Sequence, residues 1–371
     1  MKKEITFVFQ SGRTSRLNEN DETYSKEFFY SYHQFKAEYE KVHIVEFEDS
    51  SSVFNKILKY LSSIMRYLTT IPFYFEKIMY LKNLKIFIKS DVLIFTNQRV
   101  AFTSSLLIFV SKIFNKKLES SVFIMGLFIN QSKNAVRIHL RELFTLVFLK
   151  QLNKIIFLGQ GEYEYAKQKY PKFSKKFYFL PFSIDTNFWH STQDVSINKN
   201  ILFIGNDGKR DYEKVIEIAN SLRDYSFTLI SNNIDENKLT NKNISIYKGS
   251  WAENKISDLD IRTIYENSFI SIIPLVNSNQ PSGQSVALQS MAMGLPVLIS
   301  KTKGFWDNNY FKNNENIIFN YENTVQSWNK LIENMYDNKS LHSDISRNGK
   351  LLVNKRYNLE TFFSTLKSIV F

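Results

Sequence analysis

Short apolar runs rich in β-branched and aromatic residues recur along the chain, and segments with helical spacing separate them. In the first half, the predicted strands are Ile5–Phe9, Val42–Phe47, Asp91–Phe95, Val122–Met125, Lys154–Gln160 and Phe177–Asp185, with a helix expected over Glu22–Glu38. The second half restarts with a strand, a turn and a helix start over Asn200–Tyr212, followed by strands at Ser226–Ser231, Ile244–Gly249, Phe269–Leu275 and Pro296–Ser300. This alternation predicts an α/β fold with a parallel, doubly wound sheet in each half.

Two domains of ordinary size fit within 371 residues. A polar stretch from Ser183 to Asn200 breaks the strand and helix periodicities, so we place the domain boundary there. The predicted Rossmann-like domains cover residues 1–182 and 183–355. The cleft between two such domains is the expected place for a ligand.

Composition excludes several kinds of chemistry. The chain has no cysteine, which rules out disulfides, a thiol nucleophile and a thiolate metal site. We find no Asp and His spacing typical of a metal site, and so expect no metal and no cofactor. The most apolar run, Ser104–Phe114, contains Lys112 and is shorter than the roughly 18 residues of a membrane span.

The net charge of +12 lies entirely in the first half: residues 1–182 carry 28 basic and 16 acidic residues, and residues 183–371 carry 20 of each. This asymmetry indicates an anionic partner, such as a membrane surface or an acidic polymer. The segment Lys56–Lys89 holds seven basic residues and one acidic residue. It fits basic helices lying on an anionic bilayer, and equally helices packed on the sheet with lysines outward. No nucleic-acid-binding motif is recognised, so we expect no nucleic-acid partner.

The stretch from Gln280 to Leu298 reads as a loop, a short helix and a Gly-Leu-Pro-Val turn. We expect Ser282 to cap a helix over Gln284–Met293, with Gly283 allowing close backbone approach. The free amides at such a helix start suit a phosphate group. Ser285 and Gln289 share a polar face with Ser282 that could receive sugar or ribose hydroxyls. An ordinary capped helix with a solvated face is the alternative.

This stretch resembles the signature of GT-B glycosyltransferases of the "group 1" class, in which an E-x7-E motif precedes a small-residue helix and G-x-P-V. The match includes Ser282, Gly294 and Pro296, whereas Pro281 and Gln289 stand at the two acidic positions. In the family, the first acid contacts the donor sugar and the second contacts the ribose. The resemblance implies that Gln289 binds hydroxyls and that Gln280, Ser282 or Gln284 replaces the first acid.

Further segments resemble the same family. Ile201–Ala219, which includes Gly205, matches the part where basic residues hold the donor diphosphate, here Lys209 and Arg210. Ile244–Leu275 matches the base-binding segment, with contacts expected near Lys248 and Gly249. The C-terminal segment, residues 356–371, resembles the helix that crosses back to the first domain.

The first half resembles the family only in its order of elements. Gly126 stands about where many relatives carry a histidine, and His139 follows on the next predicted helix. His139 is therefore either a weak catalytic candidate or an ordinary helix residue. The loop with Ser11, Gly12 and Arg13 follows the first strand and should face the cleft, where it could meet the acceptor.

Together these features predict a GT-B protein with two Rossmann-like domains and a central cleft. The resemblance implies a metal-independent, hexosyltransferase-like enzyme that moves a sugar from a nucleotide-diphosphate donor, with UDP expected. The acceptor would be a glycan or a lipid-linked glycan in surface polysaccharide or glycoconjugate assembly. A catalytically silent, glycan-binding partner of another transferase is the alternative. We expect a cytoplasmic location, with a peripheral position on the inner face of the membrane if the basic half binds lipid.

Overall fold

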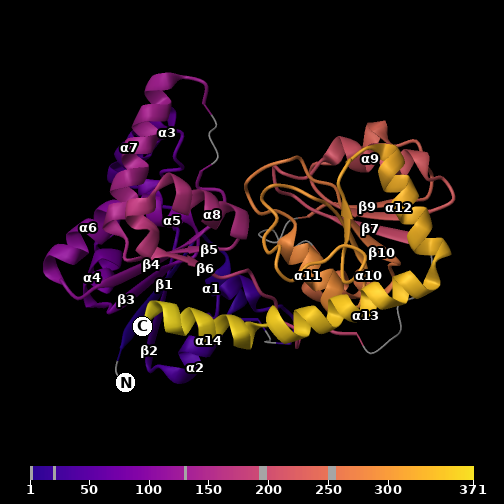
Figure 1. Cartoon of the computed structure of the whole chain (residues 1–371). Coiled ribbons are helices and arrows are strands. Elements are labelled where there is room, and N and C mark those ends of the chain that lie inside the picture. The colour runs from indigo at the N-terminus through magenta and orange to yellow at the C-terminus, as the bar shows by residue number, and fades with distance from the viewer. Residues whose placement is uncertain (1–2, 20–21, 129–131, 192–198, 250–255) are drawn as a thin grey trace.

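The computed structural model describes residues 3–19, 22–128, 132–191, 199–249 and 256–371, and Figure 1 shows two α/β units side by side. The first unit holds a six-stranded sheet in the order β2-β1-β3-β4-β5-β6, and every neighbouring pair is parallel. Its strands are β1 Glu4–Phe9, β2 Lys41–Glu46, β3 Val92–Phe95, β4 Glu119–Ile124, β5 Lys154–Phe157 and β6 Phe177–Phe179. The strands expected from the sequence are present, although the last one ends six residues earlier than Asp185.

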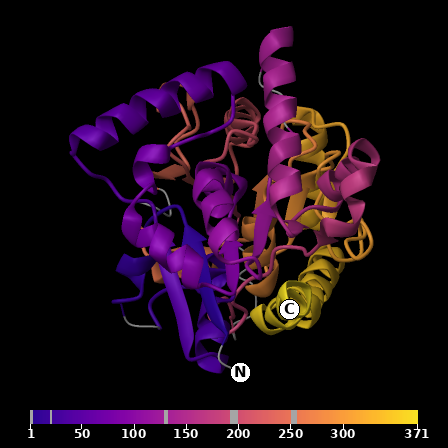
Figure 2. The same cartoon turned by 90° about the vertical axis from the view of Figure 1, so that its left-hand side faces the viewer.

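Helices surround this first sheet and connect its parallel strands. They are α1 Arg13–Arg16, α2 Tyr32–Glu38, α3 Val53–Thr69, α4 Leu81–Lys89, α5 Gln98–Thr103, α6 Ser105–Phe114, α7 Ala135–Gln151 and α8 Gln160–Lys169, with 3-10 turns η1 Glu27–Phe29, η2 Phe75–Lys77 and η3 Pro171–Lys176. Within the described residues, no helix has both the length and the apolar character needed to cross a membrane. In Figure 2, α3 runs obliquely across the upper left of this unit, and α7 stands upright beside one end of it.

The second unit has the same architecture, with a parallel sheet in the order β12-β11-β10-β7-β8-β9. Its elements are β7 Asn200–Ile204, α9 Tyr212–Ser221, β8 Ser226–Ile230, η4 Glu236–Lys238, β9 Ile244–Tyr247, α10 Asp258–Glu266, β10 Ile270–Ile273, α11 Gln284–Ala292, β11 Val297–Ser300, β12 Ile318–Asn320, α12 Val325–Asp337 and α13 Lys339–Arg356. The last helix, α14 Leu359–Val370, follows α13 and packs on the first unit. The prediction of two doubly wound domains is thus confirmed. The sheets divide the chain between Phe179 and Asn200, and the finer bounds 1–182, 183–355 and 356–371 stay predictions.

One predicted helix, in the segment before β2, is wrong. The helix expected over Glu22–Glu38 is broken, because Tyr30 and Ser31 adopt left-handed φ angles of 50° and 68°. Non-glycine residues rarely occupy this region and cannot continue a right-handed helix there. The break leaves Glu27 in the 3-10 turn η1, where it is buried and 1% exposed.

The last helices connect the two domains. Figure 1 shows α13 and α14 running along one side of the molecule, from the second domain to the first. On α14, Phe362 is buried and lies with its ring centroid 5.8 Å from Phe123 of β4 and 6.5 Å from Tyr30. The chain end therefore packs on the first domain.

We predict that Phe362→Ala lowers the free energy of unfolding by about 3–5 kcal/mol, the usual cost of removing a buried aromatic side chain. Urea unfolding followed by circular dichroism would measure it, with exposed Ser364→Ala on the same helix as the control. A loss below about 1 kcal/mol would contradict the packing described here.

Candidate functional site

The start of α11 differs from the prediction in one respect. Ser282 is not its cap; Gly283 occupies that position with a left-handed φ of 81°, which glycine adopts without strain. The Ser282 hydroxyl instead accepts a hydrogen bond from Arg210 Nη1 at 2.6 Å and donates one to Asp207 Oδ2 at 2.9 Å. Because no side chain within the described ranges caps α11, its first amides stay available to a ligand.

Arg210 brings a buried positive charge to this helix start. The residue is 5% exposed, and its Nη1 pairs with Asp207 Oδ2 at 2.9 Å. Burial lowers the pKa of Arg210, and Asp207 opposes that effect. Among the described residues, Nη2 of Arg210 makes no hydrogen bond, so it keeps its donors. Gly205 leaves room for the guanidinium, since a Cβ there would lie 2.4 Å from Arg210 Nε.

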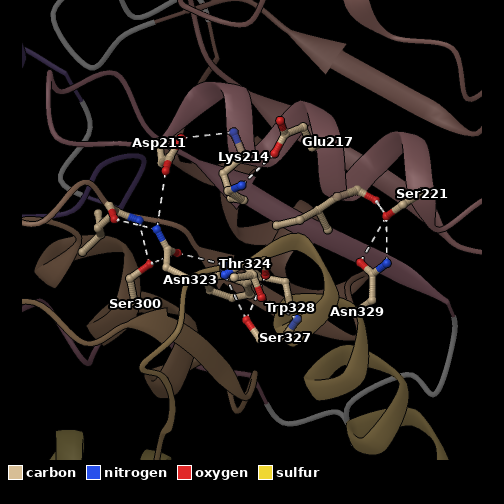
Figure 3. A network of polar contacts seen from close by, with 12 residues as sticks. Asp211, Lys214, Glu217, Ser221, Ser300, Asn323, Thr324, Ser327, Trp328 and Asn329 are labelled. Carbon is tan, nitrogen blue, oxygen red and sulfur yellow. Dashed lines mark hydrogen bonds and ion pairs between the residues drawn. The ribbon is translucent and has the colours of Figure 1, made fainter.

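A polar network fixes the turn that carries Arg210 (Figure 3). Asp211 caps α9 by accepting from the Lys214 amide, and its own amide donates to Pro274 O at 3.0 Å. Asn323 Nδ2 contacts Asp211 Oδ2 at 3.5 Å, and Ser300 donates to Asn323 Oδ1 at 2.8 Å. The turn is therefore held against the carboxyl ends of β10 and β11, the edge at which such sheets bind ligands.

A cavity of about 260 Å³, which we call the interdomain cavity, lies beside this turn. Five residues expected at a nucleotide-sugar site line it, namely Gly205, Arg210, Gly249, Ser285 and Gln289. Ser25 and Phe28 of the first domain close its other side. The structure therefore brings together predicted residues that are up to 84 positions apart in the sequence, counting from Gly205 to Gln289.

Gln289 is held on both sides of its amide. Its Oε1 accepts from the Tyr265 hydroxyl at 3.1 Å, and its Nε2 donates to Glu27 Oε1 at 2.8 Å. The same oxygen of Glu27 accepts from Trp189 Nε1 at 2.9 Å. The position expected to contact ribose thus carries an amide oriented by a carboxylate from the other domain.

Glu27 has an ionisable carboxyl group in a buried position, where its charged form is unfavourable. Burial, reinforced by Asp185 and Asp258, raises its pKa from 4.5 to about 7. Its hydrogen bonds to Gln289 and Trp189 act in the opposite direction. Sequence reasoning missed this residue, because only the domain arrangement brings Glu27 and Gln289 together.

Two further contacts join the domains around the cavity. Arg16 forms a buried ion pair with Asp258 at 3.0 Å, and the amide of Ser25 donates to the same carboxylate at 2.9 Å. On the other side, Pro281 packs on bare backbone, since a Cβ on Gly159 would lie 2.8 Å from Pro281 Cβ. In this structure the domains are therefore closed on each other.

The other residues expected at the donor site have different surroundings. Gln284 is buried, and neither its Oε1 nor its Nε2 has a hydrogen-bond partner within the described part of the chain. Such a group is costly unless a ligand or water satisfies it. Lys248 points to the edge of the sheet, where Nζ contacts Glu236 Oε1 at 3.0 Å and Ile234 O at 3.1 Å. The Lys209 side chain does not line the interdomain cavity.

A second cavity, of about 580 Å³, lies mainly in the first domain, and we call it the N-domain cavity. Gly126 lines it at the end of β4, with a left-handed φ of 92°, and Gln280 reaches it from the second domain. Buried Glu162 holds this loop by accepting from the Gly126 amide at 2.8 Å. The stretch from Pro281 to Gln284 therefore separates the two cavities.

The remaining predicted residues of the first domain do not line either cavity. Gly12 begins α1 with a φ of 82°, and Arg13 donates to Ser11 O at 3.0 Å and to Phe28 O at 3.1 Å. Arg13 thus supports the segment that borders the interdomain cavity. His139 is exposed on α7. The roles predicted for these residues stay predictions.

A larger cavity of about 770 Å³ lies on the hinge side, between the linker near Asp185 and the junction of α13 with α14. None of the residues predicted for donor or acceptor binding lines it. Size alone therefore does not locate the site. The start of α11, Arg210, Gly205 and Gly249 meet at the smaller interdomain cavity.

The architecture matches that of several solved structures. Over 98% of both chains, the protein superposes on HepE of Anabaena, solved with UDP, with a TM-score of 0.68 and 9% identity. Sucrose-phosphate synthase of Thermosynechococcus elongatus gives 0.67 and 11% identity, covering 99% of this chain and 98% of the other. A glycosyltransferase of Rickettsia africae gives 0.64 and 12% over the same shares.

These likenesses establish that the fold is GT-B, as predicted. A scan of protein-family models finds no match to the sequence, and neither does a search of the curated proteins. At identities of 9–12% the chain shares with these structures its architecture, and its activity has to be argued from its own residues.

We predict that Glu27→Gln stabilises the protein at pH 8 and changes little at pH 5. The folded-state pKa of about 7 exceeds the ordinary value of 4.5, so stability from this group is full below pH 4.5 and is lost as the pH rises through 7. A neutral isostere avoids that loss, on the order of 1–3 kcal/mol.

Thermal unfolding between pH 5 and pH 8 would measure the effect, with exposed Glu333→Gln as the charge-matched control. Equal destabilisation by Glu27→Gln at both pH values would show that Glu27 is an ionised, favourable hydrogen-bond acceptor across this range.

Proposed function

We propose that this protein is a glycosyltransferase that uses a nucleotide-diphosphate sugar and binds it in the interdomain cavity. One observation carries the proposal: the start of α11 and the free donors of Arg210 converge beside that cavity. Gln284, the first residue of α11, adds a buried side-chain amide that has no partner among the described residues. A carboxylate ligand could use the same donors, but the GT-B fold makes a diphosphate the better fit.

The donor diphosphate would lie at the helix start. Amides of α11 and Nη2 of Arg210 would bind its oxygens, since helix starts and guanidinium forks both suit phosphate. When the sugar leaves, negative charge grows on the terminal phosphate, and these fixed donors would stabilise it. Among the described residues, no group of three or more His, Asp or Glu side chains gathers as metal ligands do. We therefore assign the charge stabilisation to Arg210 and the amides.

The nucleoside would extend along the cavity toward Gly249, with Ser285 and Gln289 beside the ribose and sugar hydroxyls. UDP is the proposed carrier because HepE was solved with UDP and with UDP-glucose. In this chain, the oxygen of Gln289 and the carboxylate of Glu27 would supply acceptors that a glutamate supplies in the related motif.

Binding requires the domains to open. A volume of about 260 Å³ lies below the usual range of ligand pockets, which is about 300–1,000 Å³. The contacts of Glu27 with Gln289 and of Arg16 with Asp258 would break as the donor enters. Domain opening and closure of this kind commonly controls entry and release in enzymes.

The proposed acceptor is a glycan or lipid-linked glycan, presented to the N-domain cavity at a membrane surface in polysaccharide or glycoconjugate assembly. Helix α3 supports the proposed position at a membrane surface, because the polar side of this helix faces the protein. Buried Asn55 donates to Glu76 O at 3.0 Å, and buried Ser62 donates to Glu76 Oε2 at 2.7 Å.

The opposite side of α3 is apolar and exposed. Val53, Phe54, Ile57, Tyr60 and Tyr67 are each 55–74% exposed. Lys56 and Lys59 are exposed on the same helix. Because monomeric proteins rarely expose such a stripe, and because basic residues accompany it, an anionic bilayer is the proposed partner.

A catalytically silent partner subunit is the second candidate function. Its support is that Pro281 packs on Gly159 and Gln289 is bonded to Glu27, so both acidic positions of the related motif serve domain contacts here. Such a subunit would bind UDP weakly or not at all. Release of UDP from UDP-glucose by the purified chain, in the presence of acceptor glycolipid, would favour the transferase.

We predict that Arg210→Gln weakens UDP binding about 10- to 100-fold, because a charge-assisted hydrogen bond contributes about 1.5–3 kcal/mol. Isothermal titration calorimetry with UDP would measure it, and exposed Lys330→Gln on α12 is the charge-matched control. Unchanged affinity in the Arg210 variant would remove the proposed diphosphate site.

We also predict that Ile57→Ser with Tyr60→Ser reduces binding to anionic vesicles about tenfold or more, because each exposed apolar side chain that enters the bilayer contributes about 1 kcal/mol. Flotation with phosphatidylglycerol vesicles tests this, against phosphatidylcholine vesicles. The matched control is Leu351→Ser with Tyr321→Ser, two equally exposed residues of the second domain. An equal loss in both pairs would contradict a specific role for α3.

A further inference from the structure

Three arginines line the N-domain cavity and come from three different helices. Arg66 belongs to the last turn of α3, Arg99 to the first turn of α5 and Arg141 to the middle of α7. They are far apart in the sequence, and no motif links them. The fold gathers them where the carboxyl end of β4 meets the second domain through Gln280.

Backbone carbonyls hold the guanidinium groups of Arg141 and Arg66, and no acidic side chain among the described residues pairs with them. Arg141 donates from Nη1 to Thr70 O at 3.0 Å and from Nη2 to Leu127 O at 2.8 Å. Arg66 donates from Nη1 to Phe73 O at 2.5 Å. The ring of Tyr74 lies under two of them, 4.7 Å from the Arg66 guanidinium carbon and 5.7 Å from that of Arg99.

Within the described residues, no Asp or Glu lines this cavity and none of the three arginines forms an ion pair. Burial lowers the pKa of Arg141, and Tyr170 and Glu142, neither of which lines the cavity, act in the opposite direction. Three positive groups around one cavity repel each other, and this cost is usually offset by an anion. The lining is therefore shaped for a ligand that brings negative charge.

We propose that the N-domain cavity binds a phosphate or diphosphate group of the acceptor, next to the sugar that receives the transferred residue. The identification of this ligand as the acceptor rests on the proposed function, whereas the anion site itself does not. Guanidinium forks bind phosphate oxygens in pairs, and three forks suit a group with several oxygens better than a single carboxylate.

The position of the cavity supports this assignment. Arg66 and Thr70 lie at the end of α3, so a phosphate there could be carried by a lipid whose chain meets the exposed apolar side of that helix. Gln280 lies on the same wall and begins the stretch that separates this cavity from the donor side. The acceptor would thus be held by its charge while its sugar reaches past Gln280 toward the donor.

Isothermal titration of inorganic pyrophosphate into the full chain, with UDP present at saturation to occupy the donor site, tests the proposal. We expect binding to the wild type and at least tenfold weaker binding to Arg66→Gln with Arg99→Gln. The control is Lys116→Gln with Lys117→Gln, two exposed residues that precede β4 at the opposite end of the sheet, with a change below twofold. Arg66→Lys with Arg99→Lys keeps the charge and should fall between them.

The possible results distinguish a failure of the anion site from a failure of the proposed function. Equal weakening in the glutamine pair and in the control, or no pyrophosphate binding beside UDP, would overturn the anion site. If Arg66→Gln with Arg99→Gln also loses UDP affinity through misfolding, the pyrophosphate affinity of Arg66→Lys with Arg99→Lys tests the anion site instead. Failure of the wild type to bind UDP would count against the proposed function, whereas pyrophosphate binding that depends on Arg66 and Arg99 would still support the cavity.

A second arm identifies the source of the phosphate. Geranyl diphosphate should bind more tightly than pyrophosphate if the group is carried by a lipid, and Ile57→Ser with Tyr60→Ser should abolish that gain. Equal affinities would place the phosphate on a soluble glycan. Both results support the phosphate site, and weaker binding of both ligands than of sodium acetate would contradict it.

Discussion

The arrangement of the two domains depends on contacts made by one segment, Pro281–Gln289. Its first residue packs against the bare backbone of Gly159, and its last donates a hydrogen bond to Glu27. Between them, Gly283 turns the chain so that α11 begins beside Arg210. The same nine residues therefore contact the first domain and contribute to the proposed diphosphate site, so a ligand at the helix start would lie beside the contact between the domains.

Local patterns in the sequence were sufficient to predict most of the fold. Strands with apolar runs, the helix ended by Gly294, and the parallel sheets follow from residues close together in the chain. Arg210 and Gly205 were predictable because they lie on the turn after β7. The choice of Ser282 as cap was wrong because its hydroxyl bonds Arg210 and Asp207, which are distant in the sequence.

Residues whose role depends on the domain arrangement could not be predicted in this way. Glu27 was assigned to a helix that Tyr30 and Ser31 interrupt, and its partner Gln289 is 262 positions away. The three arginines of the N-domain cavity belong to separate helices of one basic half. A count of charges detected the excess, +12 for the whole chain, but only the fold shows that part of it converges on one cavity.

The bare backbone at the start of α8 has a mechanical consequence. A side-chain carbon on Gly161 would lie 2.4 Å from Lys303 O, and one on Gly159 would lie 2.8 Å from Pro281 Cβ. Alanine at either position would act as a wedge between the domains while leaving every wall of the interdomain cavity chemically unchanged. The two glycines thus permit the close contact between the domains, and a single added methyl group would oppose that contact.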